Sequence, residues 1–130
     1  MEPVIVASVL TLPALALLLI PFHDESGAAD TRNHLAGFRT RQTLASREAW
    51  NAAHTWARAP MRRLAAALGL VLAASIAAGV LLDLPEAAGY AILALQFTLL
   101  IGGLSLIGLR ADRIAAEVNG RDDAPPPDPR

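Results

Sequence analysis

The fold of this chain is decided by two apolar stretches: residues 64–82, LAAALGLVLAASIAAGVLL, and residues 87–109, AAGYAILALQFTLLIGGLSLIGL. Neither contains a charged residue, and only the turn DLPE at residues 83–86 separates them. A helix rises about 1.5 Å per residue, so runs of about 19 to 23 residues cover the roughly 30 Å hydrocarbon layer of a bilayer. Because lipid offers no hydrogen-bond partners, a single spanning segment has to be helical. The sequence therefore predicts two antiparallel transmembrane helices joined by a tight turn.

A third uncharged stretch, VIVASVLTLPALALLLIPF, lies near the start of the chain at residues 4–22. The alternative interpretation is a cleaved signal peptide, for which the small residues at 26–29 supply a candidate cleavage site. Met1 and Glu2 provide no positive charge before the apolar run, whereas a signal peptide has one. We therefore interpret this stretch as a span. The predicted fold is an all-α integral membrane bundle of three transmembrane helices.

The basic residues indicate the orientation of these spans. All eleven are Arg, and Lys is absent. The loop between the first and second spans contains Arg32, Arg39, Arg41, Arg47, Arg58, Arg62 and Arg63, whereas the turn at 83–86 has two acids and no base. Short loops rich in basic residues stay on the cytoplasmic side. We expect a multi-pass protein with its N-terminus outside and with its long loop and C-terminus in the cytoplasm.

Several function classes find no support in the sequence. There is no cysteine, and the histidines and acids show no metal-ligand spacing, so neither a metal site nor a cofactor is expected. The chain also lacks a nucleophile motif and a P-loop, and we expect no catalytic residue and no enzyme activity. The arginines flank apolar spans without a reading helix, which argues against nucleic-acid binding. Since the spans take up much of the chain, residues 1–120 should form one domain.

The long loop contains a predicted short amphipathic cytoplasmic helix. Its apolar and aromatic stripe repeats at helical spacing and consists of Trp50, Ala53, His54 and Ala57. Together with Trp56, this stripe favours a helix lying at the membrane surface. Pro60 is expected to mark the break or the first turn before the second span, and Gly120 to end the third one. Residues 121–130, which are charged and rich in proline, are predicted to be a disordered tail.

The same loop contains an ordered set of residues: Asn33, Gly37, Phe38, Arg39, Thr40, Thr43, Leu44, Trp50 and His54. This set resembles the signature of the SdpI-like family of small bacterial integral membrane proteins. In that signature, Asn is followed by Gly, an apolar residue and Arg-Thr, then by Thr-Leu, and finally by Trp with His or Asn four residues later. The resemblance implies a location in the bacterial plasma membrane, with residues 32–58 as the signature loop.

The resemblance also implies a role in immunity or signalling. The founding member of the family protects a bacterial cell from its own membrane-active peptide toxin and sequesters a repressor at the membrane. The partners expected from this are the lipid bilayer and a peptide toxin or cytoplasmic regulator. A second copy of the chain is a further expected partner, because the best-known relatives have six spans. The alternative is a structural or accessory subunit of a larger membrane complex.

The residue types of the signature can also be interpreted physically. Gly37 permits a tight turn, Thr40 and Thr43 can cap local backbone, and Arg39 offers a rigid fork of five donors. Burying the charge of Arg39 without a partner would be costly. The candidate partners are Glu48, carbonyl groups at helix ends, and lipid headgroups. Two interpretations of the loop stay open: a turn that fastens the loop to the helix bundle, and a binding site for peptide or lipid.

Overall fold

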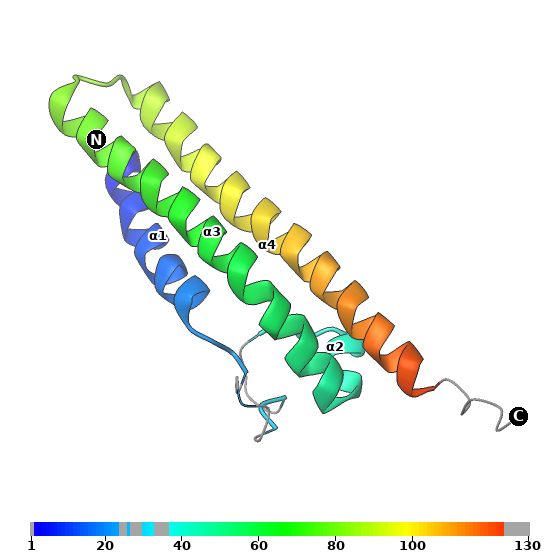
Figure 1. Cartoon of the computed structure of the whole chain (residues 1–130). Coiled ribbons are helices and arrows are strands. Elements are labelled where there is room, and N and C mark those ends of the chain that lie inside the picture. The colour runs from blue at the N-terminus through cyan, green and yellow to red at the C-terminus, as the bar shows by residue number, and fades with distance from the viewer. Residues whose placement is uncertain (1, 24–25, 27–29, 33–36, 124–130) are drawn as a thin grey trace, which may run out of the picture. The chain divides into compact units, whose positions relative to one another are not determined.

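The structure is a computed structural model of the whole chain, and it describes residues 2–23, 26, 30–32 and 37–123. These residues form four helices and no strand (Figure 1). The helices are α1 (Glu2–Leu19), α2 (Arg41–Ala45), α3 (Arg47–Leu81) and α4 (Glu86–Asp122). The predicted all-α class is confirmed for the described part of the chain. The predicted disordered tail, residues 121–130, is wrong at its start, because α4 extends to Asp122, and its residues 124–130 lie outside the described residues.

Two of the helices, α3 and α4, are long and apolar enough to cross a membrane. Their most apolar windows have mean hydropathies of 2.4 and 2.1. The apolar part of α1, Val4–Leu19, is shorter, so the third span stays a prediction. The expectation that the first helix reaches residue 22 is wrong, since α1 ends at Leu19. Pro21 explains this end, because a proline disfavours helical backbone at the residue before it.

The surface of α3 and α4 fits lipid better than water. Only 22% and 11% of their most apolar windows are buried within the protein. Large aliphatic side chains such as Leu70, Val80, Leu81 and Leu106 are more than two-thirds exposed, at 73%, 72%, 78% and 71%. Soluble proteins rarely expose contiguous apolar surface on this scale. In a bilayer, this exposed apolar surface would contact lipid instead of water.

The chain divides into two compact units, and α3 and α4 each contribute to both. We call Met1–Ile20 with Ala59–Ile107 the apolar unit, and Pro21–Arg58 with Gly108–Arg130 the signature unit. The apolar unit contains α1, the part of α3 from Ala59 onward and the part of α4 up to Ile107. The signature unit contains α2, the start of α3 and the end of α4.

In the apolar unit, α3 and α4 form the predicted helical hairpin (Figure 1). The turn between them is closed by a hydrogen bond from the Ala88 N–H to the Pro85 carbonyl, 2.9 Å long. Gly103 allows the two helices to approach closely, because a Cβ there would lie 2.7 Å from Cδ1 of Leu64. Leu68 and Leu72 of α3 are also buried.

Two predicted helix boundaries are wrong. Pro60 lies inside α3, so the expected amphipathic helix is the first part of one helix that continues into the apolar stretch. Buried positions continue at helical spacing on both sides of Pro60, at Ala57, Met61 and Ala65, and this packing opposes the break that proline favours. Gly120 also lies inside a helix, since α4 extends to Asp122.

A buried polar pair joins α1 to α4 within the apolar unit. The Thr11 hydroxyl donates to Oε1 of Gln96 over 2.6 Å, and the two residues are only 6% and 3% exposed. Gln96 lies in an otherwise apolar stretch, where leaving its Oε1 unpaired would be costly, while its Nε2 has no hydrogen-bond partner among the described residues. The bond therefore favours one seating of α1 on α4.

We expect this hydrogen bond to contribute about 0.6 to 1.7 kcal/mol to the stability of the protein, the range found for bonds between helices in membranes. Thr11→Val, Gln96→Leu and the double variant should be unfolded in mixed micelles, and their free energies of unfolding combined in a double-mutant cycle. Ser105→Ala is the control, because the exposed Ser105 bonds only to the Ile101 carbonyl of its own helix. A coupling energy near zero would contradict the assignment.

Candidate functional site

The signature residues meet in the signature unit, beginning with α2. Thr40 is the N-cap of this helix, and its hydroxyl accepts from the Thr43 N–H at 3.1 Å. In return, the Thr43 hydroxyl oxygen accepts from the Thr40 N–H at 2.9 Å, which completes a capping box. Thr43 also donates its hydroxyl proton to the Phe38 carbonyl over 2.6 Å. The predicted capping role of the two threonines is confirmed.

Gly37 brings the loop directly onto α3. Its φ angle is +111°, a conformation that residues with a side chain rarely adopt. A Cβ at this position would lie 2.7 Å from Nε2 of His54 and 2.8 Å from Cη2 of Trp50. Both the backbone conformation and the lack of space therefore require glycine here.

Both ring nitrogens of His54 form hydrogen bonds, one within α3 and the other to the loop. Its Nδ1 lies 2.8 Å from the Trp50 carbonyl, which can only accept, so Nδ1 is the nitrogen that bears the proton. Nε2 then accepts from the Phe38 N–H over 2.9 Å. The side chain is 2% exposed, and this burial lowers the pKa of His54; His23 adds to the lowering, while the bond to Trp50 opposes it. In its neutral state, the ring can form both of these hydrogen bonds.

Trp50 is fully buried in the signature unit. Its indole Nε1 donates to the Thr31 hydroxyl at 2.9 Å, and its ring centroid lies 4.0 Å from that of His54. The prediction that Trp50 lies at the membrane surface is therefore wrong. Its stripe packs against protein instead, whereas Trp56 is 37% exposed.

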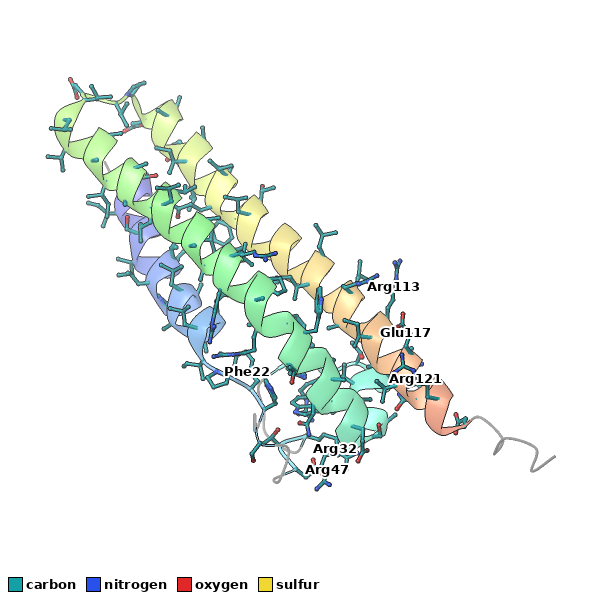
Figure 2. The ribbon with its side chains drawn as sticks, in the orientation of Figure 1. Phe22, Arg32, Arg47, Arg113, Glu117 and Arg121 are labelled. Carbon is teal, nitrogen blue, oxygen red and sulfur yellow. The ribbon has the colours of Figure 1, made fainter. Side chains whose placement is uncertain are left out.

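The first part of α3 packs against the end of α4. Ala49 and Ala53 of α3 and Ala111 and Ala115 of α4 are all 0% exposed and form one small core. Such small side chains allow two helix backbones to approach closely. On α4, exposed Arg113, Glu117 and Arg121 follow one another at a spacing of four residues and point outward (Figure 2). This part of α4 is therefore amphipathic, with its alanines on the side of α3.

Asn119 is a structural residue that the sequence analysis missed. Its amide Nδ2 donates to the carbonyl of Gln42 over 2.9 Å, and its Oδ1 accepts from the Ser46 hydroxyl over 2.9 Å. The Ser46 hydroxyl in turn accepts from the Ala49 N–H at 3.0 Å and so caps the start of α3. A single side chain of α4 thus fastens the corner between α2 and α3. No sequence pattern marks a contact between residues 77 positions apart.

Arg39 is exposed, and its Nη1 donates to the carbonyl of Arg32 over 2.8 Å. This carbonyl lies in the loop between α1 and α2 and not at a helix end, where the prediction placed it. Arg32 is fixed by an ion pair of 2.6 Å with Asp30. This hydrogen-bonded pair lowers the pKa of Asp30 to about 2, and Arg47 adds to the effect; both arginines are labelled in Figure 2. The guanidinium of Arg39 is accordingly held at the surface and is not drawn into an apolar core.

The remaining signature positions divide into two groups. Leu44 is half-buried, and its N–H continues α2 by donating to the Thr40 carbonyl at 3.1 Å. Asn33 lies outside the described residues. Across the described ranges 2–23, 30–32 and 37–123, no three His, Asp or Glu side chains come together in a way that would hold a metal ion. The described signature residues thus build one hydrogen-bonded turn, with Arg39 on its outside.

A family model described as the SdpI/YfhL protein family matches residues 31–108, which is more than half of the chain. The chain belongs to the SdpI/YfhL protein family. No curated protein and no solved structure matches it. The family match contains the whole signature loop, while Asn119 and most of the α4 segment that packs on α3 in the signature unit lie beyond it.

In this SdpI/YfhL protein, Gly37→Ala should lower the free energy of unfolding by about 1 to 3 kcal/mol, because alanine is strained at a positive φ and has no room beside Trp50. Thermal unfolding in detergent measures the change. Gly120→Ala is the matched control. Nothing lies within 4 Å of a Cβ at position 120 inside α4, so this variant should gain roughly 0.5 to 1 kcal/mol. Equal effects at the two glycines would contradict the geometry of the turn.

Asn119→Ala should loosen α2 without unfolding the protein. Losing the bonds to Gln42 and Ser46 should cost about 1 to 3 kcal/mol locally, so exchange of the Leu44 amide proton should speed up roughly tenfold per 1.4 kcal/mol. Hydrogen exchange followed by NMR measures this rate. Asn51→Ala serves as the control, because Oδ1 of Asn51 has no hydrogen-bond partner among the described residues. Unchanged exchange in Asn119→Ala would show that the hydrogen bonds of Asn119 do not stabilise α2.

Proposed function

We propose that this SdpI/YfhL family protein protects a bacterial cell from a membrane-active peptide by binding the inserted peptide against its transmembrane helices. In this proposal α1, α3 and α4 all span the plasma membrane, with the N-terminus outside and the signature unit in the cytoplasm. Family membership and the arginine-rich loop support this arrangement. The single observation that carries the binding role is a groove in the apolar unit.

The groove lies between α1 and α3 and has a volume of about 260 Å³. Its walls are almost entirely apolar and consist of Val4, Ile5, Ser8, Val9 and Leu12 from α1 and Ile76, Gly79 and Val80 from α3. Several of these side chains remain exposed, with Val9 at 61% and Val80 at 72%. The groove is therefore open to the surroundings of the two helices and is not part of their core.

The shape and chemistry of the groove suit an apolar peptide helix. An inserted helix has already satisfied its own backbone, so it needs only close packing to bind. Ser8 and Gly79 leave space in the groove, because neither places a large side chain in it. The Ser8 hydroxyl is bonded to the Val4 carbonyl of its own helix at 2.7 Å, so it presents little polarity to a ligand. Peptide bound here would be removed from the pool that damages the membrane.

The signature unit serves, in this proposal, as the signalling face. Arg39 is the exposed member of the signature, and its bond to the Arg32 carbonyl fixes the direction of the guanidinium. A planar fork of donors suits a carboxylate on a cytoplasmic regulator. The turn made by Gly37, Thr40 and Thr43 then has the role of presenting Arg39.

Filling the groove should abolish protection while leaving the protein in the membrane. A strain lacking the protein is first tested with a panel of membrane-active peptides to find one that kills it selectively. Ser8→Leu should then reduce survival in that peptide at least tenfold, because the larger side chain occupies the groove. Ser105→Leu is the matched control: Ser105 also bonds to its own helix, at 2.7 Å, but is exposed on α4 and does not line the groove.

The outcomes separate the parts of the proposal. If no peptide in the panel selectively kills the deletion strain, the protective role is wrong. If Ser8→Leu and Ser105→Leu protect equally well, the groove is not the binding site. A pull-down from native membranes with and without Arg39→Ala tests the regulator, which should be recovered only with the unchanged protein.

A further inference from the structure

The contacts of His54 make the closed loop depend on one protonation state. Nδ1 donates to the Trp50 carbonyl, and Nε2 accepts from the Phe38 N–H. A second proton on the ring would have to attach to Nε2, where it would face the Phe38 N–H donor. Two donors cannot bond to each other, so the contact that holds the loop would become repulsive.

The surroundings of His54 offer little compensation for a positive charge. Segment 21–23 brings His23, whose ring centroid lies 6.1 Å away, and His23 would itself repel an imidazolium. The loop contributes the aromatic ring of Phe38 at 5.9 Å and, next in sequence, the exposed cation of Arg39. Along α3, Trp50 stacks at 4.0 Å and Arg58 follows one turn later.

The helix α4 is the remaining element beside the surroundings of His54. It approaches Phe38 through Gly108, where a Cβ would lie 3.3 Å from Cδ1 of the phenyl ring. The charged residues nearest to this contact along α4 are the exposed Arg110 and the half-buried Asp112. Among the described residues, the His54 ring therefore forms its two hydrogen bonds with backbone groups and none with a carboxylate. A proton on this ring meets mainly apolar and cationic neighbours.

We propose that His54 is a proton-binding site, and that protonation releases residues 37–43 from α3, so that the signature unit senses pH. Release breaks the hydrogen bond of the Phe38 N–H and separates Gly37 from Trp50. It also changes the position of the exposed Arg39 side chain. This inference does not depend on the peptide groove, which lies in the other unit.

The direction of the pH dependence follows from the burial of the ring. Burial lowers the pKa of His54 in the closed loop below its value of about 6.5 in an open chain. The open state therefore binds a proton more readily than the closed state. The closed loop has its full stability above about pH 6.5, and it loses stability as the pH falls below that value toward the lower pKa.

Trp50 provides the readout, because a protonated histidine in contact quenches indole fluorescence. The full chain in lipid nanodiscs, with Trp56→Phe so that Trp50 is the remaining tryptophan, is titrated from pH 8 to pH 4.5. Emission should fall and move to longer wavelength with a midpoint below pH 6.5. His54→Asn, which keeps a donor and an acceptor but does not titrate, should abolish this transition. His23→Asn should move its midpoint to higher pH, because a repelling neighbour is lost.

Three results would overturn the proposal. The first is a transition that persists in His54→Asn, which would assign it to another group. The second is a midpoint above pH 6.5 in the reference protein, since a buried neutral ring cannot produce it. The third is an unchanged midpoint in His23→Asn, a variant that stays informative even if His54→Asn fails to fold, as judged by circular dichroism.

Discussion

The signature unit depends on the hydrogen bonds of one imidazole. His54 belongs to α3, yet its Nε2 closes the loop by accepting from the Phe38 N–H. This bond is available only because Gly37 turns the chain at a positive φ and leaves space for Trp50. Once Phe38 is fixed, its carbonyl receives the Thr43 hydroxyl, and the cap of α2 forms beside it. Each later contact thus uses a backbone group that the previous one has placed.

The sequence predicted the features that are governed by local chemistry. Uncharged runs of sufficient length marked α3 and α4, since backbone hydrogen bonding and burial in lipid act on every residue of such a run. The hairpin at residues 83–86 followed from its short length and its proline. The caps at Thr40, Thr43 and Ser46 were also predictable, because a hydroxyl bonds to the backbone within a few residues of its own position.

Other features were beyond the reach of the sequence because they are set by contacts between distant residues. An amphipathic stripe shows that one face of a helix avoids water, but it does not tell lipid from protein, and Trp50 is covered by protein. The local tendency of Pro60 to end a helix is outweighed by packing on both sides of it. Asn119 looks like an ordinary residue near a helix end until Gln42 and Ser46 are placed beside it.

The core of four alanines has a consequence for how the chain tolerates insertions. Ala49 and Ala53 of α3 meet Ala111 and Ala115 of α4 from one face of the helix. Successive residues lie about 100° apart around a helix axis, so one extra residue between Ala49 and Ala53 would turn one of the two away from α4. Within the signature unit, the number of residues in this segment therefore matters as much as their identity.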